Sequence, residues 1–383
     1  MTSIVIVLFW ISFLLLAYSY FLYPLFMILI SKTKSKGIKK DYNFKGKISF
    51  IIPAYNEEEV IKEKIDNTIE VLRGFEDSEI LIGSDGSNDR TNEIINGYKE
   101  HPQFIVKAFS ERRGKISVLN DLYALSSGEI LIFTDASSIV EKDAIKHMVS
   151  NFSVDKIGGV GAVKTNSKIK NKNNVKNQEG FYWKMEEFTK RGESRFGKLV
   201  GADGPLFAIR KELYEKLPAA TILDDFCITM KVASQSYFVY EDKAIVFEYP
   251  SKNYREEFKR RVRLSTGAYQ SMSILSKEIL SLNLLSFFFF SHKIIRWISP
   301  FLMFITLITN IFLGLKSGLY TITLSLQIVI YTFTLMAHLS ENFKKNKIIS
   351  FIYYFIISNL IQIIGFVRAL RRSSGVLWDK AQK

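Results

Sequence analysis

Three stretches of the chain, residues 3–30, 297–339 and 348–367, are apolar almost throughout and contain one charged side chain, Lys316. About 20 apolar residues are enough to cross the hydrocarbon core of a bilayer. The first stretch predicts an N-terminal transmembrane anchor over residues 1–31, because it lacks the basic start and the short apolar core of a signal peptide. A fully soluble protein is therefore excluded.

The C-terminal apolar residues predict a transmembrane region over 294–368. Three spans are expected, at 297–315, 319–339 and 348–367. The shorter apolar segment 280–293 predicts a helix that lies in the membrane interface. Lysines after the first span place the following residues in the cytoplasm, whereas three C-terminal crossings would place the basic tail 369–383 outside. The number of segments that cross therefore stays open.

Residues 44–279 show a different pattern, in which short β-branched runs alternate with segments of helical periodicity. Strands are predicted at 48–52, 79–82, 104–108, 129–133 and 159–163, and helices at 57–73, 89–100, 114–126 and 141–152. This alternation predicts an α/β domain with a mostly parallel sheet and helices on both faces. A basic amphipathic helix at 254–275 ends the domain before the membrane. In such a sheet, ligands bind beyond the carboxyl ends of the strands.

Composition and charge favour the membrane over nucleic acid as a partner. The chain has 383 residues, a net charge of +14 and 48% hydrophobic residues. Many basic residues border the apolar segments, at 32–40, 344–347 and 368–372, where they serve as topology signals and contact anionic lipids. The single cysteine, Cys227, excludes an intramolecular disulfide. We therefore expect contacts with membrane lipids and no binding of nucleic acid.

Polar turns follow three of the predicted strands: PAYNEE at 53–58, DGSND at 85–89 and TDAS at 134–137. Each turn taken alone is explained by helix capping or turn chemistry, for example by Asn56 as a helix cap. Three such turns at the carboxyl edge of one sheet are less easily explained in this way. They predict a ligand site at that edge.

The ordered series of motifs resembles the family 2 glycosyltransferases of the GT-A fold, in particular the membrane-anchored enzymes of bacterial polysaccharide synthesis. The series is PAYNEE, DGSND, RRGK at 112–115, TDAS, GADG at 201–204, LDD at 223–225 and RRVR at 260–263, followed by apolar spans. The resemblance covers nearly the whole chain. It implies a multi-pass protein of the cell membrane. Its GT-A domain is expected on the cytoplasmic side, where it would bind a nucleotide-sugar donor.

The resemblance also implies which residues bind the donor. Nucleoside contacts fall on Ala54, Tyr55 and Glu57, and Asp85 matches the carboxylate that accepts a hydrogen bond from the base. Cationic side chains bind a diphosphate well. The residues that match the family's cationic positions are Arg113 and Lys115 in the RRGK loop and Arg260 and Arg263 in the helix before the membrane.

Asp135 stands at the family's metal motif, where the resemblance implies Mg²⁺ or Mn²⁺. Such an ion is typically held by one or two carboxylates and by substrate phosphates. The sequence departs from the family's DxD pattern, because Ser137 replaces the second carboxylate. Ser137 is the candidate second ligand.

The acidic pair Asp224 and Asp225 matches the family's catalytic carboxylates. Inverting transfer needs a carboxylate that takes the proton of the acceptor hydroxyl, and we assign Asp225 as this base with Asp224 in support. Repulsion between paired carboxylates raises the pKa of one of them. Gly204 and Asp203 match the acceptor-side loop, although Asp203 is equally explained as a turn residue.

In the processive members the last basic motif reads Gln-x-x-Arg-Trp. Here Arg260 replaces the glutamine, Arg263 keeps the arginine and Leu264 replaces the tryptophan. Processive polymerisation is therefore not implied. A basic helix resting on anionic lipid heads would have the same composition, and the two roles are compatible.

We therefore expect a membrane-bound, inverting glycosyltransferase that moves a sugar from a nucleotide-sugar, with UDP ahead of GDP, to a glycan or a lipid-linked acceptor in surface polysaccharide synthesis. The nearest alternative is a polyprenyl-phosphate monosaccharide transferase. Two alternatives of another class are a transporter and a non-catalytic nucleotide-sugar-binding subunit. A transporter would need ionisable residues inside its spans, and Lys316 lies at a predicted turn.

Overall fold

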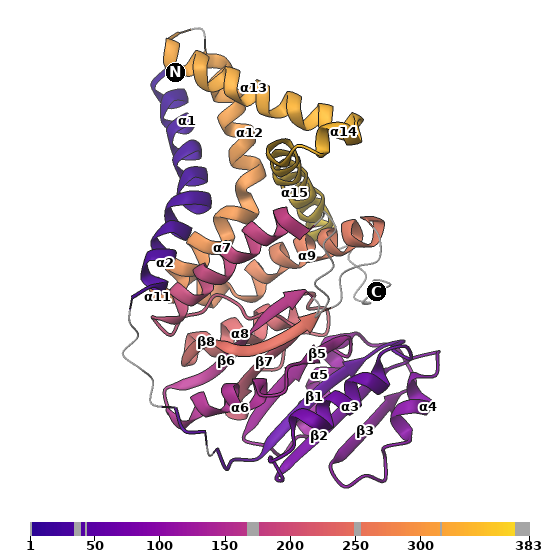
Figure 1. Ribbon diagram of the computed structural model, residues 1–383. Helices are drawn as coiled ribbons and strands as arrows, with labels where there is room; N and C mark the ends of the chain where they lie inside the picture. The colour runs from indigo at the N-terminus through magenta and orange to yellow at the C-terminus, as the bar shows by residue number, and fades with distance from the viewer. Residues whose placement is uncertain are drawn as a thin grey trace.

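The computed structural model describes residues 2–33, 40–42, 44–166, 176–248, 254–314 and 316–371. Two parts are visible in Figure 1: a sheet domain and a group of long helices that stand on it. The helices α7 (Lys176–Ser194) and α9 (Tyr254–Ile274) lie between the two parts. From position 372 on, the expected basic tail lies outside the described residues.

Within the described part of the chain, eight strands form one sheet in the order β3-β2-β1-β4-β7-β6-β8-β5. The strands are β1 (Ile48–Ala54), β2 (Ser78–Asp85), β3 (Phe104–Phe109), β4 (Ile130–Thr134), β5 (Ser138–Val140), β6 (Ile157–Asn166), β7 (Leu206–Arg210) and β8 (Tyr237–Glu248). All five predicted strands are present. The half of the sheet from β3 to β4 is parallel, as predicted. Beyond β4 the sheet is mixed, because β7 runs antiparallel to both β4 and β6.

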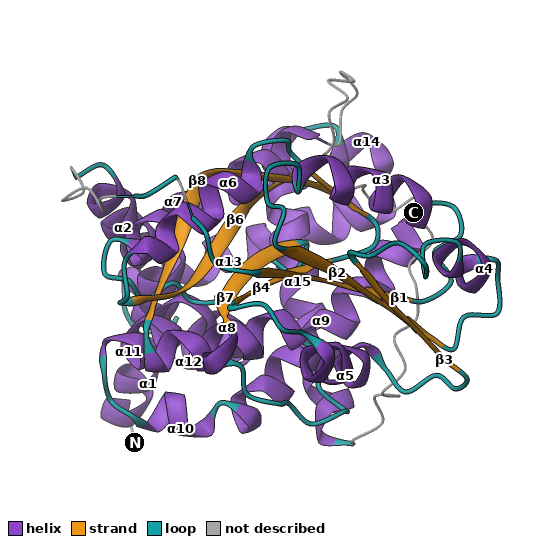
Figure 2. Cartoon of the chain, turned by 90° about the horizontal axis from the view of Figure 1, so that it is seen from below, coloured by secondary structure: helices purple, strands orange, loops and turns teal. Residues whose placement is uncertain are grey.

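Helices cover both faces of this sheet, which Figure 2 shows from below. They are α3 (Ile61–Val71), α4 (Thr91–Asn96), α5 (Lys115–Leu125), α6 (Ala144–Val149), α7 (Lys176–Ser194), α8 (Asp224–Gln235) and α9 (Tyr254–Ile274), with short 3₁₀ turns at Ser150–Ser153 and Lys211–Leu213. Alternate residues of β1 enter different cores: Phe50 and Ile52 pack with one set of helices and Ile51 with the other. Burial on both faces explains why the strands are apolar at nearly every position.

Among the described residues, four helical segments are long and apolar enough to cross a membrane, one N-terminal and three C-terminal: Thr2–Ser31, Leu284–Leu313, Gly318–Leu339 and Lys347–Leu370. The first contains α1 (Thr2–Ala17), a π-helical turn η1 (Tyr18–Leu22) and α2 (Tyr23–Ser31). The others contain α11 (Leu284–Phe289), the π-helical turn η4 (Phe290–Ile294), α12 (Ile295–Leu313), α13 (Gly318–Leu339) and α15 (Lys347–Leu370), with α10 (Ser276–Leu280) and α14 (Glu341–Lys344) as short connections. The chain is therefore a membrane protein.

The segment 280–293 differs from the prediction of a separate interfacial helix. From Leu284 it continues without a break through η4 into α12, because Phe290–Ile294 keeps helical backbone in a π-helical turn. Phe288 and Phe289 belong to a buried core of the sheet domain. The apolar side chains that suggested contact with lipid therefore pack, in part, against protein.

Candidate active site

The sheet register brings the predicted polar turns together at one edge. Ala54 at the end of β1 pairs with Ser84, which precedes Asp85. Ile51 pairs with Phe133, so Asp135 follows at the same edge. Because β7 is antiparallel to β4, its first residue rather than its last lies there, and the Thr134 hydroxyl donates to the carbonyl oxygen of Pro205 (2.8 Å). The carboxyl ends of β1, β2 and β4 thus meet the loop that contains Gly204.

The first two turns are tied to each other by hydrogen bonds. Asn56 adopts a positive φ of 52°, and its side-chain oxygen accepts from the backbone N–H of Asn88 (2.9 Å). This partner replaces the helix-capping role considered for Asn56. The backbone N–H of Glu57 donates to Thr91 Oγ1 (2.7 Å), and the Glu57 side chain is buried.

Asp85 holds the RRGK loop in place. Its carboxylate is buried and accepts from the backbone N–H of Arg113 (2.7 Å) and of Gly114 (2.9 Å). Gly114 has a φ of 92°, which a side chain would strain. An ionised carboxylate has about four acceptor positions, so Asp85 retains capacity for a base N–H, and that predicted role stays a prediction.

Tyr55 lies against an arginine that the sequence analysis did not select. The Arg112 guanidinium is 3.9 Å from the centroid of the Tyr55 ring, a close cation–π contact. Arg113 lies 4.0 Å from the Phe109 ring and pairs with Asp121 (2.6 Å). The RRGK motif itself was the signal for Arg112, since its first arginine comes from the same loop.

Lys115 lies between two acidic motifs that are far apart in the sequence. Its Nζ is 2.9 Å from Asp135 Oδ1 and 3.0 Å from Asp224 Oδ2. Burial lowers the pKa of this ammonium, but Asp135, Asp224 and Asp225 outweigh burial and raise its pKa well above the usual value. Lys115 therefore stays charged and balances the carboxylates. A small pocket lies here, lined by Pro53, Lys115, Leu119, Phe133, Thr134, Asp135, Gly204, Phe207 and Asp224.

Asp224 and Asp225 occupy the first turn of α8. Burial, together with the charge of Asp224, raises the pKa of Asp225 to about 7, although Lys115 opposes this shift. Asp225 Oδ1 accepts from the backbone N–H of Phe226 (2.8 Å). A Cβ at Gly204 would lie 2.6 Å from Asp225 Oδ2, so a larger residue here would displace this carboxylate. The structure thus places Gly204, a predicted acceptor-side residue, directly against the predicted base.

The other acceptor-side residue, Asp203, pairs with Lys190 of α7 (2.8 Å). Ser137 is buried beside Asp135. Ala54 is buried at the end of β1. These positions agree with a site at the carboxyl edge, and the specific roles of the three residues stay predictions.

Helix α9, which carries the basic motif, packs against the loop that precedes the acidic pair. Gln270 accepts from the backbone N–H of Ile222 (2.9 Å), and Gly267 lies against Leu223. Arg260 makes a two-point ion pair with Glu257 of its own helix (2.8 and 2.9 Å), and Arg263 is half-buried. The contact that both arginines would make with a diphosphate stays a prediction.

A second residue that the sequence analysis missed supports the Asp135 turn from behind. Lys64 of α3 is fully buried, and its Nζ donates to Thr134 Oγ1 (2.7 Å) and to the Ser138 carbonyl oxygen (2.9 Å). Burial lowers its pKa to about 7. Lys64 sits at an apolar position of a helical pattern, so its role could not be predicted from spacing.

Comparison with known proteins shows what this chain resembles. The model of glycosyl transferase family 2 matches residues 49–218. A poly-beta-1,6-N-acetyl-D-glucosamine synthase of Staphylococcus epidermidis is 26% identical over 368 residues, which cover 88% of this chain and 87% of that protein. A protein of the same name from Staphylococcus aureus (strain COL) is 29% identical over 229 residues, which cover 58% of this chain and 55% of that protein.

Among solved structures, the mannosyltransferase PcManGT from Pyrobaculum calidifontis, in complex with GDP-Man and Mn²⁺, superposes with a TM-score of 0.71. The match covers 96% of this chain and all of that one, at 19% identity, and so bears on the fold. Residues 49–218 are therefore a glycosyl transferase family 2 domain of GT-A fold, and the chain is a glycosyltransferase with membrane helices.

Proposed function

We propose that this enzyme transfers an N-acetylhexosamine from a UDP-linked donor to the hydroxyl of a growing surface glycan, with inversion at the anomeric carbon. The observation that carries the proposal is the placement of Asp225 beside Gly204, next to the cluster of Lys115, Asp135 and Asp224. The names of the Staphylococcus relatives support the sugar and the glycan acceptor. The UDP moiety rests on the resemblance of the motifs.

Asp225 has the properties of a general base for this reaction. The acceptor O–H attacks the anomeric carbon, the bond from that carbon to the diphosphate oxygen breaks, and the proton passes to Asp225 Oδ2. A pKa of about 7, raised by burial and by Asp224, matches the base to neutral pH, where proton transfer is most effective. The nucleoside diphosphate leaves with the bonding electron pair.

Lys115 is placed to meet that leaving group. Its ammonium lies in the same pocket as Asp135 and remains charged. Charge-assisted hydrogen bonds to phosphate are stronger than neutral ones. Arg113 and Arg263 would add cationic donors, the first from the loop that Asp85 orders and the second from α9.

The oxygen atoms around Asp135 suit a divalent cation that takes most of its ligands from substrate phosphates and water. Asp135, Asp224 and the Ser137 hydroxyl offer hard oxygen atoms, which Mg²⁺ and Mn²⁺ prefer. Among the described residues, no group of three or more His, Cys, Asp or Glu side chains forms a complete cage. Such an ion supplies charge stabilisation to the departing diphosphate.

The position of the N-terminal residues supports a cytoplasmic catalytic domain. Lys316, in the turn between α12 and α13, donates to Thr2 Oγ1 (3.1 Å), so this turn and the N-terminus lie together. Figure 1 places them at the far end of α1 and α12 from the sheet. Lys32 lies at the end of α2 and Lys40 pairs with Glu241 of β8, so these two lysines after the first span are on the sheet side, as the positive-inside rule requires of the cytoplasmic side.

A donor screen on the purified full chain in detergent tests the proposed function. UDP-GlcNAc, UDP-Glc, UDP-Gal and GDP-Man are compared by release of nucleoside diphosphate, with and without a GlcNAc oligosaccharide acceptor. We expect UDP-GlcNAc to give the fastest, acceptor-dependent release. Transfer only to a polyprenyl phosphate would instead identify a monosaccharide–lipid transferase. Tight donor binding without turnover would identify a binding subunit.

The raised pKa of Asp225 predicts a pH profile. Because its acidic form is favoured below pH 7, the base is lost as pH falls, and kcat/KM should rise with pH to a plateau above an apparent pKa near 7. Asp225→Asn should lower kcat by about 10²- to 10⁴-fold and leave UDP affinity nearly unchanged. A flat wild-type profile, or an Asn variant with normal turnover, would rule out Asp225 as the base.

The position of Lys115 predicts that it competes with a metal ion. Its ammonium lies about 3 Å from the carboxylates of Asp135 and Asp224, where a divalent cation would meet repulsion. Lys115→Met should therefore raise the Mn²⁺ affinity of the donor-free protein by about 10-fold or more. The affinity is measured by titration, with electron paramagnetic resonance reporting the concentration of free Mn²⁺. Equal affinity in both proteins would contradict this arrangement. Arg113→Met, which removes a cation outside the Asp135–Asp224 pair, is the control.

A further inference from the structure

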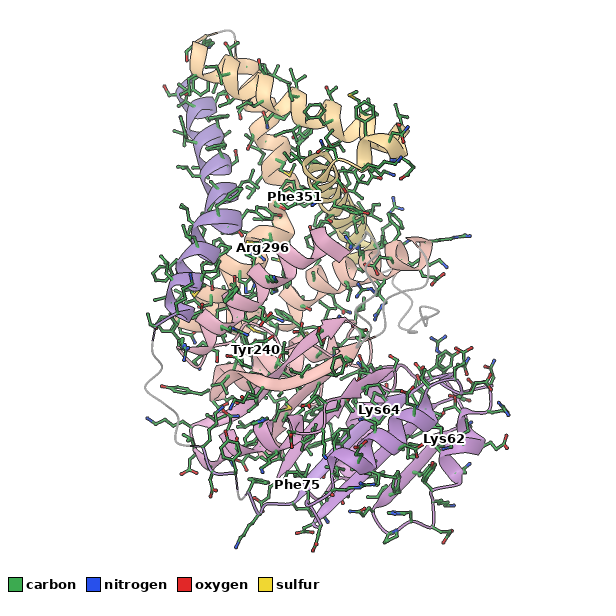
Figure 3. All side chains as sticks on the ribbon, in the orientation of Figure 1. Lys62, Lys64, Phe75, Tyr240, Arg296 and Phe351 are labelled. Carbon is green, nitrogen blue, oxygen red and sulfur yellow. The ribbon has the colours of Figure 1, made fainter. Side chains whose placement is uncertain are left out.

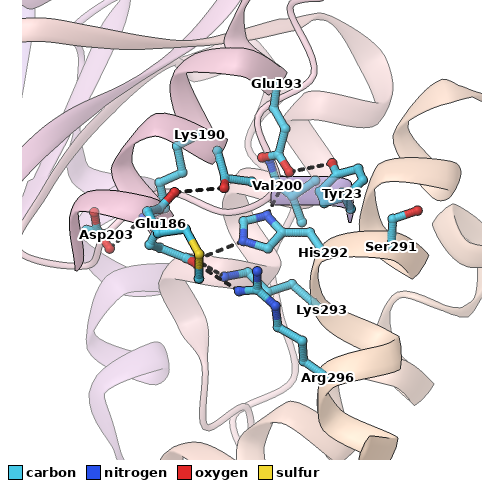
Figure 4. A network of polar contacts seen from close by, with 12 residues as sticks. Tyr23, Glu186, Lys190, Glu193, Val200, Asp203, Ser291, His292, Lys293 and Arg296 are labelled. Atoms are coloured by element: carbon cyan, nitrogen blue, oxygen red, sulfur yellow. Dashed lines mark hydrogen bonds and ion pairs between the residues drawn. The ribbon is translucent and has the colours of Figure 1, made fainter. Parts of the chain in front are cut away.

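Helix α7 carries three buried charged side chains on one face. Glu186, Lys190 and Glu193 are separated by four and three residues, the spacing that aligns side chains on a helix. Their exposed fractions are 5%, 5% and 0%. Charged residues are almost never buried to this extent unless they are paired. We call these three residues the α7 stripe, which Figure 4 shows in its contacts.

One end of the α7 stripe contacts the first of the C-terminal membrane segments, Leu284–Leu313. Glu186 contacts Arg296 Nη1 (2.9 Å) and His292 Nε2 (3.0 Å), and it also pairs with Lys293. Burial raises the pKa of Glu186, but these basic side chains outweigh burial and hold its pKa well below the usual range. Figure 3 places Arg296 where the long helices meet the sheet domain.

The other carboxylate of the stripe joins both membrane segments to a loop of the active site. Glu193 Oε1 accepts from Tyr23 Oη (2.8 Å) of the N-terminal anchor and lies 2.7 Å from His292 Nδ1. Its Oε2 accepts from the backbone N–H of Val200 (3.1 Å), at the start of the acceptor-side loop 200–204. Glu193 thus has partners in three parts of the fold.

Lys190, the middle residue of the stripe, binds the same loop nearer its tip. Its Nζ is 2.8 Å from Asp203 Oδ1. Burial lowers the pKa of Lys190, but Asp203 and the stripe's two glutamates raise it above its usual value. Lys190 is therefore a charged anchor for the residue that precedes Gly204.

The loop is then fixed against α8, the helix that begins with the acidic pair. The backbone N–H of Ala202 donates to Thr229 Oγ1 (3.2 Å), and this hydroxyl donates to the Asp225 carbonyl oxygen (2.8 Å). Gly204 follows, with no room for a Cβ beside Asp225 Oδ2. A shift of Asp203 would therefore move the Gly204 backbone, which lies against the Asp225 carboxylate.

We propose that Lys190 is a positioning residue for the transfer reaction: with Glu193 it holds loop 200–204 between α7 and α8, and so sets the place of Gly204 against Asp225. The α7 stripe ties this loop to the two membrane segments, so the membrane helices form part of the support of the base. Apolar replacement of buried ion pairs is often neutral for stability. The buried Lys190–Asp203 ion pair is therefore better explained by a role in positioning the loop than by a contribution to stability. The inference rests on the proposed function for its effect on transfer, but not for its effect on the loop.

The test compares Lys190→Met with Arg191→Met, a matched control on the next position of the same helix, whose partners are Glu187 and Asp242. Hydrogen–deuterium exchange of the peptides that cover 199–206 is measured in the full chain in detergent. We expect faster exchange in this segment for Lys190→Met and wild-type exchange for Arg191→Met. Transfer by Lys190→Met should fall about 10-fold or more in kcat, with UDP affinity within about 2-fold of wild type.

The double variant Lys190→Met/Asp203→Asn keeps the test decisive if the single variant unfolds, because it removes both charges together. Unchanged exchange in 199–206 in a folded variant, or transfer equal to that of Arg191→Met, would overturn the inference. So would an equal loss of UDP binding and transfer, which indicates general damage. If the loop loosens as expected while wild-type protein transfers no sugar, the positioning inference holds and the proposed function fails.

Discussion

The ammonium of Lys115 between Asp135 and Asp224 is the interaction on which the candidate site depends. The carboxyl edge of the sheet gathers Asp85, Asp135, Asp224 and Asp225 from three separate motifs. Two like charges about 4 Å apart repel by about 4 kcal/mol at an effective dielectric constant of 20. Asp85 is stabilised by backbone N–H groups, and Lys115 balances the others, while Asp225 takes a raised pKa. A diphosphate arriving at this edge would meet a cation that is already in place.

The membrane helices belong to the support of this site and do more than anchor it. Phe226, the residue after Asp225, packs against Phe289 and Trp297 of the C-terminal helix, with ring centroids 5.4 and 5.6 Å apart. Gly192 of α7 lets the backbone of the N-terminal anchor approach, since a Cβ there would lie 2.4 Å from the Met27 carbonyl oxygen. Both membrane segments are thus packed against elements that carry the acidic pair or its neighbouring loop. An acceptor held at the bilayer would be met by a base of fixed position.

Much of the fold could be predicted because strands and helices of the parallel half have distinct local periodicities, and polar turns mark where each strand ends. The antiparallel direction of β7 and its place between β4 and β6 could not, because they depend on pairing over long sequence distances. The continuation of 284–293 into α12 was missed for a related reason: apolar side chains that pack on Phe226 look the same in sequence as side chains that face lipid. Motif order selected Asp135 and Asp225 as candidates, whereas Lys64 and Lys190 lie at unremarkable helical positions, and only the fold reveals their buried partners.

The central claim is a single displacement in which Asp225 takes the acceptor proton while the diphosphate leaves from the opposite side of the anomeric carbon. The stereochemistry of the first product tests it most directly, by proton NMR of the newly formed glycosidic linkage after one turnover with an α-linked UDP-sugar. The account predicts a β-linked product with no α-anomer. An α-linked product would require retention, and it would contradict a mechanism built on one attacking hydroxyl and one carboxylate base.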